Sequence, residues 1–100
     1  MAKPLPPVHP GEIIREDILK PWNMSVNQLA KALAVDAARL NEIVRGRRGI
    51  TADTALRLSR YLGTTPEFWL NLQNHYELSV ARQTKLKEIE RAVQPRSEAA

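Results

Sequence analysis

The chain contains no cysteine, only two histidines and no long uninterrupted apolar run. The lack of cysteine excludes disulfide bonds and any zinc or iron–sulfur site held by thiolates. His9 and His75 lie far apart and lack the spacing of metal ligands, so we predict no metal and no other cofactor. The N-terminal stretch lacks the apolar core of a signal peptide, and no segment approaches the roughly 20 apolar residues that cross a bilayer. We therefore expect a cytoplasmic protein without membrane contacts.

The residue combinations that many enzymes use are also missing. The four glycines do not form a phosphate-binding loop, and neither histidine has a carboxylate at a spacing that indicates an acid–base pair. The serines are explained as helix caps or surface residues. No residue is predicted to be catalytic, and we expect that the chain is not an enzyme.

The positive charge of the chain is concentrated in its middle. The formal net charge is +4. Residues 25–63 carry the whole excess, because acidic and basic side chains balance in residues 1–24 and again in residues 64–100. A concentrated basic region is typical of proteins that bind a polyanion such as nucleic acid. Composition alone leaves open a solvated surface of mixed charge.

The spacing of apolar residues and helix caps predicts five helices and no strand, so we assign the chain to the all-α class. Proline at the first helical position indicates a first helix from Pro10 to Lys20. The later helices are expected to begin after N-cap residues, at Ser25, Asp36, Thr51 and Thr65. Gly46 and Gly63 are placed to end the third and fourth helices. The fifth helix is expected to reach about Val93, with a break possible in residues 77–85.

These elements divide the chain into four parts. We predict a flexible N-terminal tail at 1–8, a helix-turn-helix DNA-binding domain at 9–73, a helical extension at 74–94 and a frayed tail at 95–100. The helix-turn-helix itself is predicted at about residues 25–45. Only about three residues, 34–36, join its two helices, which favours a steep crossing over a long antiparallel hairpin. The positions that must pack in such a motif carry suitable residues, namely Leu29, Ala30, Val35, Leu40 and Ile43.

The outward positions of the third helix predict how the motif contacts DNA, since a recognition helix presents its N-terminal residues to base edges in the major groove. The predicted base contacts are Ala37, Ala38, Arg39, Asn41 and Glu42. Arg39 suits a bidentate contact to guanine, while Glu42 suits cytosine or the orientation of a neighbouring arginine. The predicted phosphate contacts are Asn27, Gln28, Arg45, Arg47, Arg48 and Thr51. For several of these residues, simple solvation, capping or a loop salt bridge remains the alternative.

Five segments of the chain resemble the HigA/VapI antitoxin family, within the Cro/lambda-repressor-like helix-turn-helix group. They are His9–Ile14, Leu29–Leu33, Asn41–Val44, Arg48–Leu58 and Thr65–Gln73. The resemblance implies a five-helix, lambda-repressor-like domain with a C-terminal helical extension. It also implies an antitoxin of a type II toxin–antitoxin module, which neutralises a small RelE-like toxin that cleaves mRNA and represses its own operon. The family commonly forms homodimers to which the C-terminal part contributes. Here the resemblance implies an interface in the segment after Pro66, including Trp69, Leu72 and Tyr76, and a role in dimerisation for the extension at 74–94.

One residue departs from the family pattern. Where this family often has glycine in the turn between the second and third helices, the chain has Ala34. If this position requires a positive φ, alanine costs about 1 kcal/mol relative to glycine.

The mechanism that we expect is a two-fold dimer that places two recognition helices in successive major grooves. The half-sites of its palindromic operator would lie about 34 Å apart on double-stranded DNA. Two alternatives remain open at this stage. One is a stand-alone phage- or plasmid-type regulator without a toxin, and the other is a protein-interaction module that has lost DNA binding.

Overall fold

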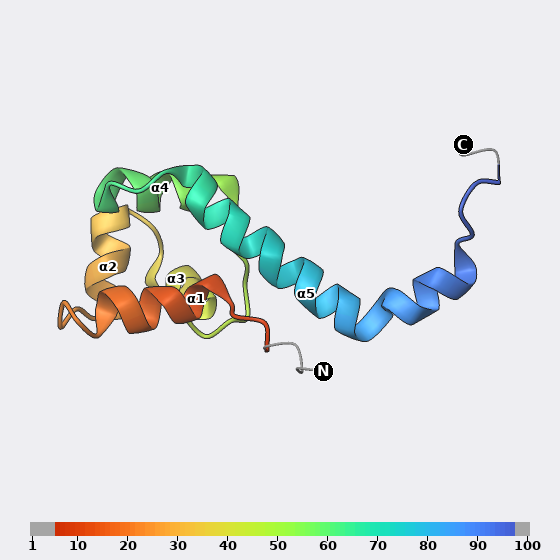
Figure 1. Ribbon diagram of the computed structural model, residues 1–100. Coiled ribbons are helices and arrows are strands. Elements are labelled where there is room, and N and C mark those ends of the chain that lie inside the picture. Colours follow the sequence, from red (N-terminus) through yellow and green to blue (C-terminus); the bar gives the residue numbers. More distant parts are fainter. Residues whose placement is uncertain (1–5, 98–100) are drawn as a thin grey trace.

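The computed structural model describes residues 6–97, and all regular structure in this range is helical. The elements in order are α1 (Pro10–Ile13), η1 (Ile14–Leu19), α2 (Val26–Leu33), α3 (Ala37–Val44), α4 (Ala52–Leu62) and α5 (Pro66–Ala92). A globular part holds the helices up to α4, and α5 projects far beyond it (Figure 1). The principal extents of the molecule are 54 × 29 × 22 Å. The predicted all-α class is confirmed for the described residues.

Local sequence signals set most of the helix ends. Ser25 and Gln28 form the predicted capping box, in which each side chain accepts a hydrogen bond from the backbone N–H of the other, at 3.1 and 2.9 Å. The other predicted N-caps are confirmed as well, since the side chains of Asp36, Thr51 and Thr65 accept backbone hydrogen bonds at the starts of α3, α4 and α5. Gly46 and Gly63 follow α3 and α4 with φ of +78° and +80°, as the C-terminal positions of helices favour.

The first helix differs from the prediction. The sequence predicts one α-helix up to Lys20, whereas a single α-helical turn leads into the π-helical segment η1. The N–H of Lys20 donates to the carbonyl of Arg15, five residues earlier, at 3.1 Å. The buried residues of this segment are Ile14, Ile18 and Leu19. Their spacing of four and five residues suits the wider π turn better than the 3.6-residue α turn.

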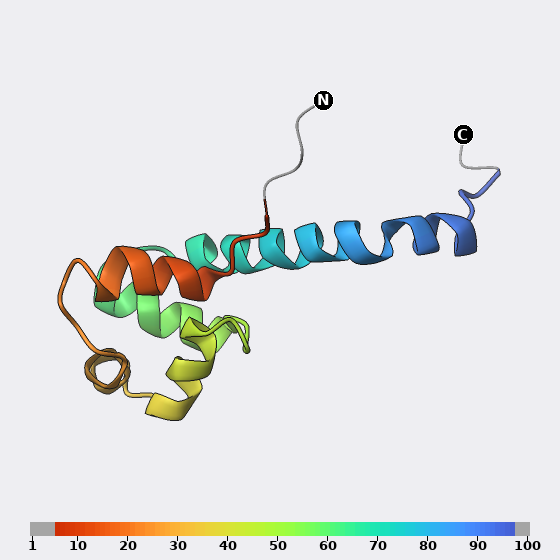
Figure 2. The ribbon, with the colours of Figure 1, turned by 90° about the horizontal axis from the view of Figure 1, so that it is seen from below.

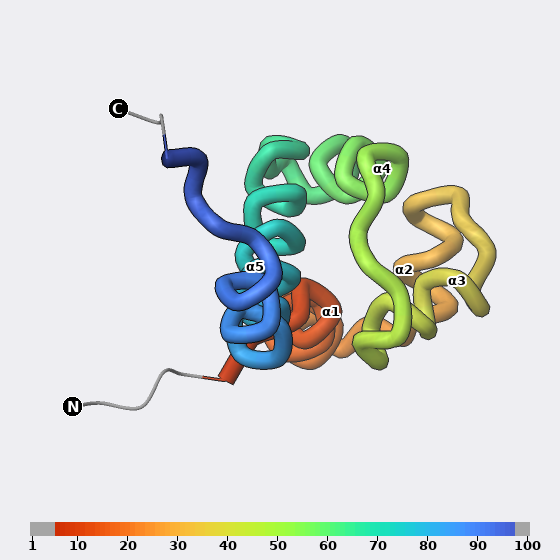
Figure 3. Tube along the Cα trace, turned by 90° about the vertical axis from the view of Figure 1, so that its right-hand side faces the viewer, coloured from red at the N-terminus to blue at the C-terminus, as the bar shows by residue number. Residues whose placement is uncertain are grey.

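The core lies between all the helices and includes the residues predicted to pack in the helix-turn-helix. Leu29, Ala30, Leu40 and Ile43 are buried, and Val35 is partly buried against them. At Gly11, α1 reaches the backbone of α3, because an added Cβ would lie only 1.8 Å from the carbonyl oxygen of Ile43. Seen along α5, α2 and α3 lie on the opposite side of the domain from α5 (Figure 3).

Helix α5 is continuous from Pro66 to Ala92, so the break considered for residues 77–85 does not occur. The helix changes direction in its blue section (Figure 1). The hydroxyl of Thr84 donates to the carbonyl of Val80 at 2.8 Å, a bond that often bends helices.

The boundary predicted between residues 73 and 74 falls inside this helix. Of the tails predicted at residues 1–8 and 95–100, residues 1–5 and 98–100 lie outside the described residues. Between residues 6 and 97, no helix combines the length and the apolar character required to cross a membrane.

Candidate nucleic-acid interface

The turn between α2 and α3 depends on a left-handed alanine and an arginine from α4. Ala34 has φ +56° and ψ +44°, the conformation for which glycine is the usual residue, so the condition stated for this position is met. The N–H of Val35 donates to the carbonyl of Ala30 at 3.0 Å and closes the turn. Arg57 donates from Nη1 to the carbonyls of Leu33 and Ala34, both at 3.0 Å. A cation at these carbonyls also suits the negative end of the α2 dipole.

Helix α3 presents a stripe of four residues away from the core. Leu40, Ile43 and Val44 are buried. Ala38, Asn41, Glu42 and Arg45 recur at i, i+3, i+4 and i+7 on the other side, where Ala38 and Arg45 are exposed and the other two are half-buried. We call these four residues the α3 stripe. The helix lies at the edge of the domain remote from α5 (yellow in Figure 2), so a ligand can approach the stripe without meeting α5.

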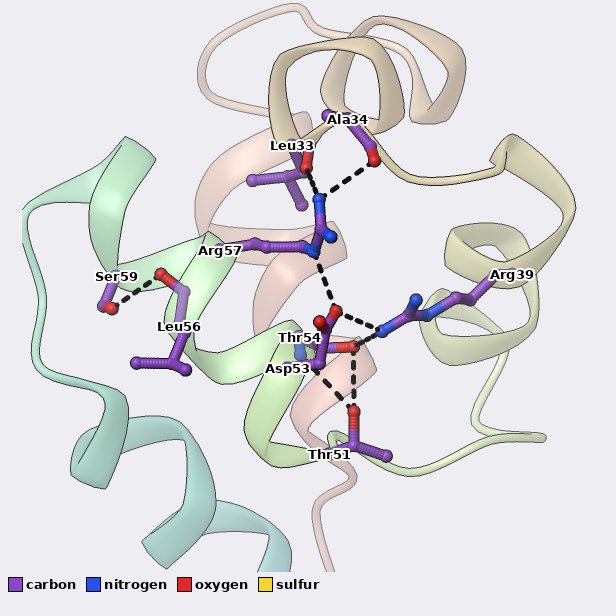
Figure 4. A network of polar contacts seen from close by, with 9 residues as sticks. All are labelled: Leu33, Ala34, Arg39, Thr51, Asp53, Thr54, Leu56, Arg57 and Ser59. Atoms are coloured by element: carbon purple, nitrogen blue, oxygen red, sulfur yellow. Dashed lines mark hydrogen bonds and ion pairs between the residues drawn. The ribbon is translucent and has the colours of Figure 1, made fainter.

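Two predicted base-contacting residues lie beside this stripe and not on it. Ala37 is half-buried and packs against the hydrophobic core, because it follows the N-cap on the inner side of the helix. Arg39 turns toward the start of α4, where its Nη2 donates to Asp53 Oδ1 at 3.1 Å and to Thr54 Oγ1 (Figure 4). The predicted bidentate contact of Arg39 with a base therefore requires a rearrangement of the conformation seen here, whereas Ala37 keeps part of its surface exposed.

Glu42 is paired with an arginine from the loop after α3. Its Oε1 lies 2.7 Å from Arg48 Nη2, and both side chains are about half exposed. Of the two roles predicted for Glu42, the structure contains the orientation of a neighbouring arginine. An exposed pair of this kind contributes little to stability, typically below about 1 kcal/mol, so an incoming phosphate can compete for Arg48.

The predicted phosphate contacts occupy the first turn of α2, the connection from α3 to α4 and the cap of α4, and all of them are exposed. Gln28 uses its Oε1 in the capping box, which leaves its Nε2 free to donate. Thr51 accepts the N–H of Thr54 at 3.4 Å as the N-cap of α4. Arg45 and Arg47 have no carboxylate within ion-pair distance among residues 6–97. Free cationic and amide donors near helix N-termini are what a phosphate backbone requires.

Sequence reasoning missed two residues that hold the arginine-bearing loop in place. Gln73, 6% exposed on α5, accepts the buried N–H of Ile50 at 2.8 Å, and its amide lies against Gly49. His9 caps α1 by accepting the N–H of Gly11 at 2.9 Å, and its ring lies edge-on to Tyr76. The one sequence feature that could have indicated a buried Gln73 is its position four residues after Trp69, which places an amide on an apolar face of the helix.

Two groups near this interface, the carboxyl of Asp53 and the imidazole of His9, have a lowered pKa. Hydrogen bonds from Arg57 and then from Arg39 hold the pKa of the Asp53 carboxyl below its ordinary value. Burial lowers the pKa of His9, and a hydrogen bond with the backbone of Arg48 acts in the opposite direction. Within residues 6–97 no group of three or more His, Cys, Asp or Glu side chains is arranged to hold a metal ion.

The residues predicted for a dimer interface are placed differently from one another. Trp69 is 1% exposed, and its Nε1 donates to Thr64 Oγ1 at 2.8 Å, so its side chain belongs to the core of a single chain and is not available to a partner. Leu72 and Tyr76 are half-buried against the same globular part. The exposed apolar side chains of α5 are instead Phe68, Leu78, Leu86 and Ile89, followed by Val93 at its C-cap.

Comparisons with known proteins match this architecture. The helix-turn-helix family model HTH_3 matches residues 17–69. Virulence-associated protein I of Dichelobacter nodosus is 58% identical over 81 residues, which cover 81% of this chain and 75% of that protein. The structure of antitoxin HigA with the higBA promoter, from Pseudomonas aeruginosa, is similar with a TM-score of 0.85 at 47% identity, over 89% of this chain and 97% of that one. Antitoxin GraA in complex with its operator gives a TM-score of 0.87 at 47% identity, over 96% and 97%.

Proposed function

This chain belongs to the helix-turn-helix family HTH_3, in the group that includes virulence-associated protein I and the HigA antitoxins, and we propose that it is a DNA-binding repressor and antitoxin. The family is non-enzymatic, in agreement with the absence of catalytic residue combinations from the sequence. In the proposed role the protein binds the operator of its own operon and neutralises a RelE-like toxin that cleaves mRNA. Two similar structures, of HigA and GraA, were determined with promoter or operator DNA, which supports the first part of this role.

The observation that carries the proposal is the α3 stripe and its surroundings. Small and polar side chains of α3 are accompanied by exposed cations, namely Arg45 of the stripe itself, at the C-cap of α3, and Arg47 of the loop that follows. In the complex, Asn41 would hydrogen-bond a base edge and Ala38 would contact a thymine methyl. The exposed loop arginines and the α2 and α4 N-termini would contact phosphates and fix the register.

DNA binding is tested by fluorescence anisotropy with a labelled duplex from directly upstream of the reading frame, against a scrambled duplex. The native duplex is expected to bind at least about 1,000-fold more tightly. Asn41→Ala should weaken binding to the native duplex by about 1–3 kcal/mol and leave the scrambled duplex unaffected. Arg47→Ala should weaken both and reduce the slope of log K against log salt by about 1. Equal binding of the two duplexes by the wild-type protein would contradict the proposed repressor function.

We further propose that the protein acts as a homodimer and that the exposed apolar side chains of α5 contribute to the contact. A two-fold dimer would place two copies of α3 about 34 Å apart, one helical turn of a palindromic operator. Leu86→Ala with Ile89→Ala should weaken self-association by roughly tenfold or more, since each removes apolar area from the contact. Lys85→Ala with Glu88→Ala, on the same turns and with unchanged net charge, is the matched control for sedimentation equilibrium. Equal dimer dissociation constants for the two double variants would remove these residues from the interface.

The antitoxin part of the proposal is tested separately from DNA binding. A small basic reading frame beside this gene would encode the candidate toxin. Co-expression should lead to a complex that co-purifies, and the purified antitoxin should stop mRNA cleavage by its partner. If the adjacent product neither binds nor cleaves mRNA, the stand-alone regulator considered from the sequence replaces the antitoxin.

A further inference from the structure

The carboxylate of Asp53 connects three helices, namely α2 and α3 of the helix-turn-helix and α4, which packs beside them. Asp53, in the first turn of α4, accepts on its Oδ1 both Arg39 Nη2 at 3.1 Å and Arg57 Nε at 2.7 Å (Figure 4). Arg39 comes from α3, and Arg57 continues to the carbonyls of Leu33 and Ala34 at the end of α2. A single oxygen atom is therefore the junction between the turn after α2, the body of α3 and the start of α4.

The geometry of the Arg39 guanidinium limits what else this side chain can bind. The Nη2 group carries two hydrogens, and two acceptors, Asp53 Oδ1 and Thr54 Oγ1, lie within hydrogen-bond distance of it. A guanidinium offers two edges for a bidentate contact, the Nη1–Nη2 end and the Nε–Nη2 side, and both edges include Nη2. A bidentate contact from Arg39 to guanine thus requires that the contact with Asp53 or Thr54 first be broken.

The surroundings of Arg39 favour retention of its contact with Thr54. Thr54 is 2% exposed and the Arg39 side chain is 28% exposed, so their hydrogen bond is partly shielded from water, whereas the Asp53 side chain is 56% exposed. The turn that Arg57 holds contains Ala34 in a left-handed conformation, for which an L-amino acid with a Cβ has no intrinsic preference. The hydrogen bonds of Arg57 therefore stabilise a turn that alanine does not favour, and those of Arg39 hold α3 against the start of α4.

We propose that Asp53 is a specificity-determining positioning residue, which acts through Arg39 and Arg57 to fix the orientation of the α3 stripe, and that Arg39 serves this connection and does not read a base. The inference rests on the proposed DNA binding. The lowered pKa of Asp53 agrees with it, because the carboxylate is the form that both arginines stabilise. The reading of bases then falls to the α3 stripe, whose orientation relative to α2 the two arginines maintain.

The test is a double-mutant cycle on DNA discrimination, with Arg39→Ala, Asp53→Asn and the double variant. Discrimination is the ratio of the dissociation constants for the scrambled and native duplexes. Each single variant should lower this ratio by about threefold to tenfold, and the double variant should be no worse than the larger single effect, because both changes break one connection. The salt slope of Arg39→Ala should equal that of the wild type, since a positioning residue releases no counterions. Asp17→Asn removes the same charge at an exposed position of η1 and controls for the gain in net charge.

Three results of this mutant cycle would overturn the inference. In the first, Arg39→Ala loses discrimination at one base pair only, and Asp53→Asn keeps or gains affinity for the native duplex beyond the Asp17→Asn control. Arg39 would then be a residue that reads a base and is restrained by Asp53. A salt slope reduced by about 1 in Arg39→Ala would make it a phosphate ligand. Additive effects in the double variant would separate the two residues.

A second readout does not depend on DNA and separates failure of this inference from failure of the proposed function. The backbone amides of Val35 and Leu40 are hydrogen-bonded in the turn and in the first turns of α3. Their hydrogen exchange should accelerate by about tenfold in both single variants and remain unchanged in Asp17→Asn. If the wild-type protein does not discriminate between duplexes but these amides respond, the repressor function fails and the structural connection stands. Unchanged exchange in both variants would overturn the positioning role itself.

Discussion

The two ends of α5 belong to one continuous helix, yet they are stabilised in different ways. The proximal part, from Pro66 to Glu77, places Trp69 and Gln73 in the interior and Tyr76 against His9, and the distal part runs from residue 82 to the end of the helix. From residue 82 to its end every residue is exposed, and none of the ion pairs among residues 6–97 involves this stretch. The distal part extends a helix that packing has already nucleated, with residues of high helix propensity such as Ala, Arg, Lys, Leu and Glu.

This difference assigns separate tasks to the two parts. The proximal part closes the hydrophobic core and holds the loop that carries the candidate phosphate ligands, so its side chains affect folding and the DNA-binding surface together. The distal part contributes nothing to the core of a single chain and carries exposed Leu86, Ile89 and Val93. Its apolar side chains are therefore free to contribute to association.

The largest expected effect that distinguishes the two parts is the loss of Trp69. Trp69→Ala removes a fully buried indole and the hydrogen bond to Thr64, and should lower the free energy of unfolding by about 3–5 kcal/mol. Leu86→Ala, 42% exposed on the distal part, should change the free energy by less than about 0.5 kcal/mol. Urea denaturation at protein concentrations below the dimer dissociation constant provides the measurement. A Trp69→Ala protein of unchanged stability but weaker association would return Trp69 to the interface and break the comparison.

A smaller effect is expected from the contact between α5 and the loop after α3. Gln73→Ala leaves the buried N–H of Ile50 without its acceptor, which should cost about 1–3 kcal/mol of unfolding free energy. Asn74→Ala, exposed on the next position of the same helix, is the control and should be close to neutral. Hydrogen exchange at Ile50 locates the effect, because this amide should lose protection beyond the change in global stability. Equal losses in the two variants would show that Gln73 acts only through the helix itself.

The sequence predicts the features of this fold that are encoded within a few residues. The capping box at Ser25 and the glycine at position 46 were recognisable because a cap and its partner lie within one helical turn. Local hydrogen bonds and φ preferences determine both, so no tertiary information was needed. The left-handed φ of Ala34 is different, because the sequence raised it only as a condition, from the glycine of the resembling family, and Arg57, 23 residues away, holds the turn.

Contacts between distant segments determine where Arg39 and Trp69 lie, and the sequence does not indicate these contacts. Arg39 lies 14 residues from Asp53, and no local pattern indicates that the start of α4 holds it. At the start of α5, Phe68 and Trp69 are adjacent and both apolar, but they lie about 100° apart around the helix. Phe68 is 44% exposed and Trp69 is buried, and the choice between them depends on the packing of α5 against the other helices.

The smallest effect concerns pH and the contact of His9 with the proximal part of α5. Burial lowers the pKa of His9 from its ordinary value of 6.5, so the folded state prefers the neutral ring, whose Nδ1 accepts the N–H of Gly11. The stability that this preference contributes is fully present above pH 6.5 and is lost as the pH falls through the lowered pKa. Unfolding free energies measured between pH 7.5 and 5.5 should therefore decline in the wild type. His9→Asn keeps an N-cap acceptor without a titrating ring and should flatten this decline, whereas His75→Asn, on the exposed side of α5, should retain it. A decline that persists in His9→Asn would mean that the proximal part of α5 does not communicate with the N-terminal cap through this ring.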